Sequence, residues 1–281
     1  FINFRTKKKA NQELESMNEN LTKKNIEITE AHNQITDSIY YAMRIQQAVL
    51  PYYERVDTFL KEYFIFFKPK SIVSGDFYWI ERIEGYTFAA VIDCTGHGVP
   101  GAFMSIIGND LLNQIIKDKK IYSPAKILEE LHLGVRRALQ QKDKIGEPHD
   151  GMEICLVRIK DDELVFAGAK RPLWYVRNGS FEEIKGNRRP IGGRQKEPTR
   201  TFENHKIDIK DELTLYLTSD GFADQNDPNN ENYSISRLKR TLKSISKLRM
   251  TEQRKTLKRE LDDFAQGEPN RDDITVIGIK L

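Results

Sequence analysis

The first 50 residues carry a seven-residue apolar repeat, and this repeat constrains the fold more than any other feature of the chain. No Gly or Pro interrupts residues 11–49, and Pro51 ends the run. We therefore predict one long helix over these residues, with a narrow seam along one face. The first seam positions are Leu14, Leu21, Ile28, Ile35, Ala42 and Val49, and the second are Met17, Lys24, Ala31, Ser38 and Ile45.

A helix with so narrow an apolar seam needs a partner helix, because it cannot bury the seam by itself. The simplest partner is a second copy of the chain, in a parallel coiled-coil homodimer. Lys24 and Ser38 weaken the seam, and a marginal coiled coil suits a signal relay. A plain dimerisation spacer explains the same pattern equally well.

The start of the chain has an apolar stub followed at once by a basic cluster of Arg5, Lys7, Lys8 and Lys9. This order is typical of the cytoplasmic end of a transmembrane helix. One expectation is therefore the cytoplasmic portion of a membrane-anchored protein, with a sensor domain upstream in the same full-length chain. A solvated N-terminal tail is the alternative. No stretch in the sequence reaches the roughly 20 apolar residues that span a bilayer.

Charge and cysteine content exclude several classes of protein. The chain has 45 basic and 42 acidic residues, a net charge of only +3, which argues against nucleic-acid binding. Its two cysteines, Cys94 and Cys155, cannot form a disulfide framework or a cysteine-only zinc site. A reducing cytoplasm is the natural location for such a chain.

After Pro51 the helical repeat gives way to short runs rich in aromatic and β-branched residues, which predict strands. Asn178-Gly179 is a strong hairpin signal between two of them. Helical patterns are grouped between these runs instead of alternating with each one, so we predict an α+β fold: an antiparallel β-sandwich flanked by helical layers. The expected domains are a regulatory helix over 1–50 and a globular domain over 51–281. The predicted strands are Tyr63–Phe67, Phe77–Ile80, Tyr86–Ile92, Glu153–Ile159, Leu164–Ala167, Leu173–Val176, Phe181–Ile184, Leu213–Thr218 and Ile274–Ile279, and the predicted helices are 101–117, 124–141 and two within 234–266.

Acidic residues stand at the ends of four of these apolar runs. A single Asp-Gly is usually only a turn, but the set is more informative than any of its members. Carboxylates that converge from several strand ends could hold two Mg²⁺ or Mn²⁺ ions, which prefer oxygen ligands. Such ions acidify water and balance charge during phosphoryl transfer. The acidic residues are Asp76, Asp93, Asp220 and the pair Asp272-Asp273.

The segments around these residues resemble the metal-dependent type 2C protein phosphatases, within the branch named after stage II sporulation protein E. The resemblance covers residues 39–281, and within it residues 39–51 resemble the helix that leads into the phosphatase domain. Its four motifs are Ser74-Gly75-Asp76-Phe77-Tyr78-Trp79, Asp93-Cys94-Thr95-Gly96-His97-Gly98, Thr218-Ser219-Asp220-Gly221 and Asp272-Asp273-Ile274-Thr275.

The resemblance implies a ligand set for two Mn²⁺ or Mg²⁺ ions. Asp93 would bridge both ions, and the backbone carbonyl of Cys94 would complete one site. Asp220 and Asp272 would hold the other ion, and Asp76 would coordinate directly or through water. Asp273 would orient the site from behind the ligands.

The implied reaction is hydrolysis of phosphoserine or phosphothreonine by a metal-activated water, with Asp76, Asp93, Asp220 and Asp272 as the catalytic set. Cys94 is not expected to be a nucleophile, because no phosphate-cradling loop ending in Arg follows it. His97 could protonate the leaving oxygen, but a loop-stabilising role is favoured.

No arginine for the substrate phosphate stands just before Asp76; Lys70, together with Lys68, could substitute, although such lysines are usually only solvated. By resemblance, the substrate is a phosphorylated bacterial signalling regulator, such as an antagonist of an anti-sigma factor. The N-terminal helix would control activity.

Two other functions remain open at this point. The first is a catalytically silent relay, in which the coiled coil and a phosphatase-like domain only bind partner proteins. The intact acidic set, including Asp93 and Asp220, disfavours it. The second is a structural coiled-coil protein, which leaves the globular pattern unexplained.

Overall fold

The computed structural model describes residues 2–51, 53–142, 149–197 and 199–281. The chain divides into two compact units, Phe1–Arg44 and Ile45–Leu281. The predicted long helix is present as α1. Because α1 ends at Val49 and the second unit begins at Ile45, the last residues of this helix belong to the globular unit. The helices are α1 (Ile2–Val49), α2 (Tyr53–Val56), α3 (Gly98–Asn113), the π-helical turn η1 (Gln114–Asp118), α4 (Pro124–Ala138), α5 (Gly221–Asp224), α6 (Ile235–Ile245) and α7 (Met250–Ala265).

The described residues of the globular unit form two sheets. The order is β1-β11-β10-β6-β7 in a five-stranded sheet and β2-β3-β4-β5-β9 in a six-stranded sheet, in which β8 also pairs with β4. Neighbouring strands in both orders are antiparallel. The strands are β1 (Tyr63–Lys68), β2 (Phe77–Ile83), β3 (Tyr86–Cys94), β4 (Gly151–Lys160), β5 (Glu163–Ala169), β6 (Leu173–Arg177), β7 (Ser180–Ile184), β8 (Ile191–Gly192), β9 (His205–Asp208), β10 (Leu213–Thr218) and β11 (Ile274–Lys280).

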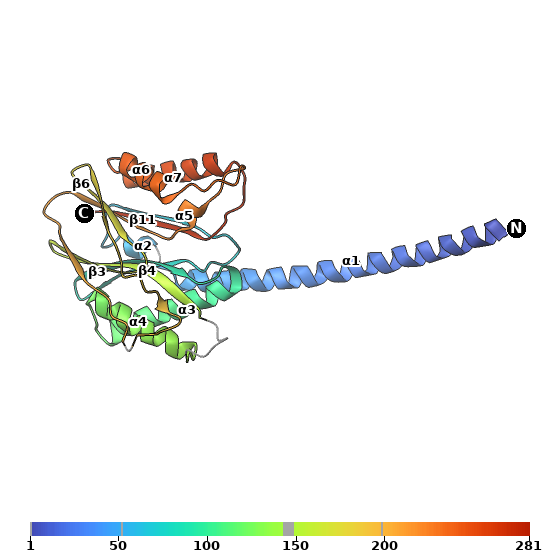
Figure 1. Ribbon diagram of the computed structural model, residues 1–281, viewed down its shortest axis with the longest axis horizontal. Helices are drawn as coiled ribbons and strands as arrows, with labels where there is room; N and C mark the ends of the chain where they lie inside the picture. Colours follow the sequence, from blue (N-terminus) through green and yellow to red (C-terminus); the bar gives the residue numbers. More distant parts are fainter. Residues whose placement is uncertain (1, 52, 143–148, 198) are drawn as a thin grey trace. The chain divides into compact units, whose positions relative to one another are not determined.

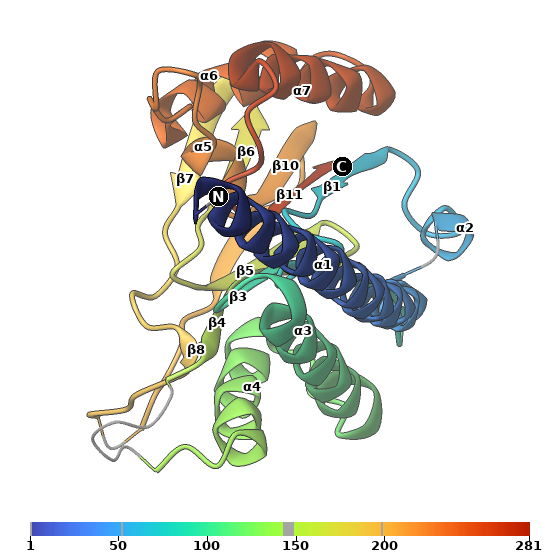
Figure 2. The same cartoon turned by 90° about the vertical axis from the view of Figure 1, so that its right-hand side faces the viewer.

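The two sheets lie face to face between two helical layers, as Figure 1 shows. Helices α3 and α4 cover the outer face of the six-stranded sheet, and α6 and α7 cover the outer face of the five-stranded sheet (Figure 2). Three apolar clusters fill the spaces between these layers. The predicted α+β sandwich with flanking helices is therefore confirmed.

Strand β2 shows how the sequence builds this stacking. Successive side chains of a strand point to opposite faces of the sheet. Trp79 accordingly packs in the cluster beneath α3 and α4, whereas Tyr78 and Ile80 pack in the cluster between the sheets. Because both faces of the sheet are covered, the strand needs a nearly continuous apolar run.

The predicted hairpin at Asn178-Gly179 is present between β6 and β7. Both turn residues have positive φ angles, 49° and 78°, as a tight hairpin turn of this type requires. Strands β8 and β9 and the short helices α2 and α5 were not predicted, because each has at most four residues and too little pattern to detect.

The seam of α1 is exposed in the single chain. The side chains of Leu14, Leu21, Ile28 and Ile35 are 55–66% exposed. Within the described ranges of the chain, no helix is both long and apolar enough to cross a membrane.

Candidate metal centre

Antiparallel pairing brings the predicted acidic residues to one end of the β-sandwich. Phe77 pairs with Ile92, so Asp76 at the start of β2 lies beside the end of β3 that carries Asp93. Thr218 pairs with Val276 in the same way, so Asp220 lies beside the residues that precede β11. We call this region, with Asp76, Asp93, Glu153, Arg171, Asp220 and Asp272, the carboxylate end.

Three carboxylates at this end lie close enough together to share a cation. One oxygen each from Asp93, Glu153 and Asp220 falls within 4.8 Å of the other two. Asp93 and Asp220 were predicted as ligands, whereas Glu153 was not. Glu153 reaches the site because it is the register partner of Asp93 across β3 and β4.

Arg171, just before β6, contacts all three of these carboxylates through a single nitrogen. Its Nη2 lies 2.6 Å from Asp93 Oδ2, 2.5 Å from Asp220 Oδ2 and 2.8 Å from Glu153 Oε2. Charge-assisted contacts of this length are strong. Arg171 was not among the predicted site residues, because no local pattern in the sequence indicates that it meets the acidic residues.

The pKa of Asp93 is shifted by its burial and by the charges around it. Burial raises its pKa to about 8; Arg171 opposes the shift, and Asp220, Glu153 and Asp272 add to it. One guanidinium therefore does not fully compensate the carboxylates, and a divalent cation would relieve the remaining repulsion. The hard oxygen donors fit Mg²⁺ or Mn²⁺.

Asp76 is buried beneath the cluster. Burial raises its pKa well above the usual range, and the charge of Asp93 adds to the shift. Thr275 Oγ1 donates a hydrogen bond of 2.7 Å to Asp76 Oδ2 and fixes this carboxylate from the neighbouring sheet. Asp272 lies at the edge of the cluster, and its Oδ1 accepts a hydrogen bond of 2.8 Å from the backbone N–H of Asp273.

Asp273 ties the segment that carries Asp76 to the start of β11. The backbone N–H of Lys70 donates to Asp273 Oδ1, and that of Gly75 donates to Asp273 Oδ2, both at 2.7 Å. The buried Asp273 thus shapes the loop before β2 through its backbone. Lys70 takes part through its backbone N–H, and Lys70 as a whole is exposed.

The backbone at Cys94 is packed against glycines without space for side chains. A Cβ atom on Gly75 would lie 2.3 Å from Gly96 O and 3.3 Å from Cys94 O, and one on Gly101 would lie 2.3 Å from Gly96 O. The carbonyl of Cys94 therefore borders the segment that carries Asp76. The thiol is buried, and burial raises its pKa well above the usual range, so it stays protonated.

His97 stands at the N-cap position of α3 and is exposed. Within the described residues, no hydrogen bond or ion pair joins its imidazole to the carboxylates, so a proton-donor role for His97 stays a prediction.

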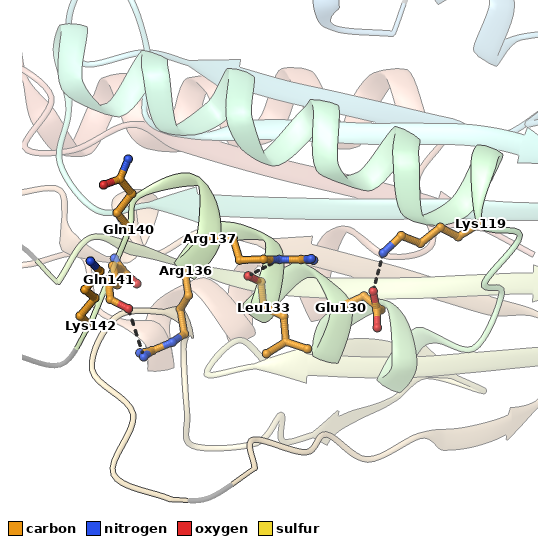
Figure 3. Close-up of a pocket in the computed structure, with 8 residues that line it drawn as sticks. All are labelled: Lys119, Glu130, Leu133, Arg136, Arg137, Gln140, Gln141 and Lys142. Carbon is orange, nitrogen blue, oxygen red and sulfur yellow. Dashed lines mark hydrogen bonds and ion pairs between the residues drawn. The ribbon is translucent and has the colours of Figure 1, made fainter.

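A basic hollow of about 660 Å³ lies elsewhere, along the C-terminal part of α4 (Figure 3). The carboxylate in its described lining, Glu130, is paired with Lys119 at 2.6 Å. None of the predicted metal ligands is among the described residues that line this hollow, so the carboxylate end is the better candidate for a catalytic site. The lining residues are Lys119, Glu130, Leu133, Arg136, Arg137, Gln140, Gln141 and Lys142.

Comparison with known protein families decides the relationship. The family model for stage II sporulation protein E (SpoIIE) matches residues 83–281. The chain belongs to the SpoIIE family. As the motifs predicted, this globular unit is a type 2C (PP2C) protein serine/threonine phosphatase domain.

Solved structures agree with the PP2C assignment. The SiaA-PP2C domain of Pseudomonas aeruginosa is 31% identical, with a TM-score of 0.79, over 89% of this chain and 98% of that one. The PP2C domain and a regulatory fragment of SpoIIE from Bacillus subtilis give 19% identity and a TM-score of 0.63, over 78% of this chain and 62% of that one. At that identity the likeness shows the fold alone.

A third similar structure contains the RsbU and RsbW domains of a Mycobacterium tuberculosis protein. It is 17% identical, with a TM-score of 0.57, over 79% of this chain and 60% of that one. No curated protein sequence matches the chain.

Proposed function

We propose that the carboxylate end hydrolyses phosphoserine or phosphothreonine in a protein substrate, with Mn²⁺ or Mg²⁺ held by Asp93 and Asp220. The observation that carries this proposal is the close approach of Asp93, Glu153 and Asp220, within 4.8 Å. Bound divalent ions of this class acidify water and balance the charge of a phosphoryl group. The further ligands would be Asp272, Asp76 and the carbonyl of Cys94.

The residues behind the ligands keep the centre in place before any ion binds. Asp273 holds the backbone before Asp76 through Lys70 and Gly75, and Thr275 orients the Asp76 carboxylate itself. Such contacts orient ligands and govern metal affinity. Because Asp273 directly precedes β11 and Thr275 belongs to it, these contacts also join the two sheets at the site.

The test of this function is Mn²⁺-dependent phosphate release from a phosphoserine peptide. Asp220→Asn keeps the shape of the side chain but removes its charge, and turnover should fall by about 10³-fold. Asp211→Asn removes an exposed carboxylate just before β10 and is the matched control, which should keep full activity. If purified, folded protein loaded with Mn²⁺ shows no turnover, the catalytically silent, partner-binding relay becomes the better account.

The proposed substrate is a small phosphorylated signalling regulator of the type that antagonises anti-sigma factors. The support is the family relationship, together with a similar structure in which an RsbU and an RsbW domain occur in one protein. Phosphorylated regulators of this class, compared as substrates against unrelated phosphoproteins, should be dephosphorylated selectively. Equal rates on all of them would exclude this specificity.

We also propose that the N-terminal helix controls activity, through Gln46. This buried side chain donates from Nε2 to Ser74 O at 2.6 Å and to Ser105 Oγ at 2.8 Å. Its Oε1 accepts from the N–H of Ser74 at 3.1 Å. The last turn of α1 thus holds the segment Ser74-Gly75-Asp76, and a shift of that turn would move a predicted ligand.

A pair of neighbouring variants tests this connection. Gln46→Ala should lower turnover at least tenfold, because a misplaced ligand weakens both metal binding and catalysis. Gln47→Ala, at the adjacent exposed position, should leave turnover unchanged. If removal of residues 1–44 alters neither turnover nor metal affinity, regulation by the N-terminal helix is excluded.

Dimerisation through α1 belongs to the same proposal. The exposed seam of Leu14, Leu21, Ile28 and Ile35 supports a parallel coiled coil. Light scattering should give a dimer for the chain and a monomer for Leu21→Lys combined with Ile28→Lys. A monomer for the unmodified chain would contradict the proposal.

A further inference from the structure

Arg171 places a positive charge where the ligands of the proposed metal centre converge. The three carboxylates that its Nη2 contacts, at 2.5–2.8 Å, are the same three whose oxygens lie within 4.8 Å of one another. An ion held by these oxygens would have to lie among them, in contact with each. The nitrogen and the ion would therefore compete for one position.

Arg171 contacts the three carboxylates as a single point charge would, through one nitrogen. Arginine in a permanent ion pair commonly presents two nitrogens to one carboxylate as a fork. Here a single Nη2 serves Asp93, Glu153 and Asp220, and the buried Nε of Arg171 has no hydrogen-bond partner among the residues that the structure describes. The guanidinium is thus held by the charge of the three carboxylates, and its planar fork of donors adds little to the binding.

The backbone beneath Arg171 is firmly fixed. A Cβ atom on Gly168 would lie 2.3 Å from Arg171 O, and one on Gly186 would lie 2.6 Å from it, so the carbonyl fits only between two glycines. The neighbouring N–H of Lys170 donates to Asn187 O at 2.7 Å. The main chain therefore keeps its place, and only the side chain is free to change its position.

We propose that Arg171 is a tethered cation that fills the metal centre in the metal-free protein and is displaced when a divalent ion binds. Its charge holds Asp93, Glu153 and Asp220 together in the absence of the ion. In return, the ion must displace it, so Arg171 sets the metal concentration at which the phosphatase becomes loaded. This inference rests on the metal-dependent function proposed above.

Calorimetric titration with Mn²⁺ tests the competition. Arg171→Gln should bind Mn²⁺ at least about tenfold more tightly than the unmodified chain, because the binding-competent state is no longer a minor one. Lys170→Gln is the matched control, since Lys170 also pairs with Glu153, at 2.8 Å, from a more exposed position. It reports how much of the gain comes simply from removing a nearby positive charge.

A second measurement uses the unmodified chain and does not depend on whether the variant folds. The ¹⁵N-labelled side-chain Nε signal of Arg171, followed by NMR, should move as diamagnetic Mg²⁺ saturates the centre. An Arg171 signal that stays in place with bound Mg²⁺, or equal gains in affinity for Arg171→Gln and Lys170→Gln, would overturn the inference and leave the proposed function standing. If the unmodified chain binds neither ion and turnover needs neither, the proposed function fails with it.

Discussion

Two regions of the globular unit bury polar side chains in opposite ways. Beneath α6 and α7, the hydroxyl of Tyr216 donates to Gln253 Oε1 at 2.7 Å, and Gln253 Nε2 donates to the carbonyls of Ser246 and Leu248 at 3.2 and 3.0 Å. Every group in this Tyr216–Gln253 network is neutral and has a partner. At the carboxylate end, by contrast, Arg171 is the cation shared by Asp93 and its neighbours.

The difference separates residues that support folding from residues that support function. A buried polar network with all its partners present strengthens one fold. A cluster with surplus negative charge costs stability and persists where a ligand supplies the missing charge. Changes at the carboxylate end should therefore affect activity first, and changes in the Tyr216–Gln253 network should affect stability alone.

Among the substitutions that test this contrast, Gly101→Ala should produce the largest effect, and it tests the first half. The new Cβ would lie 2.3 Å from Gly96 O and 2.7 Å from Gly75 Cα, so the loop after Cys94 and the segment that carries Asp76 must shift. A displacement of about 1 Å at a reaction centre costs about 100-fold in turnover.

Gly134→Ala is the control for this experiment, because the three atoms nearest to its Cβ all belong to the side chain of Leu111, the first at 2.8 Å. Turnover of this variant should remain unchanged. Full activity of Gly101→Ala would show that backbone packing does not position the ligands.

Gln253→Leu tests the second half of the contrast. The substitution conserves volume but removes the amide that donates to the carbonyls of Ser246 and Leu248. The hydroxyl of Tyr216 keeps only its longer hydrogen bond to Leu242 O, at 3.3 Å. We expect a loss of about 2–3 kcal/mol in the free energy of unfolding. Urea denaturation measures this loss, and turnover under stabilising conditions should stay normal. A loss of turnover without a loss of stability would contradict the conclusion that this network supports folding alone.

Tyr216→Phe should have a smaller effect in the same direction. Only one hydroxyl is removed, and Gln253 keeps both of its donated hydrogen bonds. The expected cost is about 1 kcal/mol. A cost as large as that of Gln253→Leu would mean that Tyr216 is the central member of the network.

His132 should give the smallest effect, as a dependence of stability on pH. Its Nδ1 accepts from the N–H of Gly192 at 3.0 Å, and its Nε2 lies 2.9 Å from Gln195 Oε1, so a neutral ring protonated on Nε2 satisfies both contacts. Burial lowers the pKa of His132 below its ordinary value of 6.5, although Gln195 opposes the shift. The unfolded chain therefore binds the proton more readily than the folded one.

The stability that neutral His132 contributes should be present above pH 6.5 and decline as the pH falls below this value. Urea midpoints of the unmodified chain should drop more steeply between pH 7 and pH 5 than those of His132→Gln. Parallel curves would show that the ring takes up its proton equally in both states.

The sequence alone determined most elements of this protein, since the patterns that produce them are local. The repeat in residues 11–49 predicted α1, the turn pair Asn178-Gly179 predicted the β6–β7 hairpin, and the grouping of helices predicted the layered α+β fold. The four acidic motifs also led to the family that the comparisons then established.

Only the tertiary structure determined which side chains contact one another at the carboxylate end. Glu153 reaches Asp93 through the register of β3 with β4. Arg171 reaches both from the connection between β5 and β6, which lie in different sheets. Gln46 lies 28 positions from Ser74 in the chain. Local propensity carries no record of such pairings, because they arise when apolar layers pack and bring distant strand ends to one place.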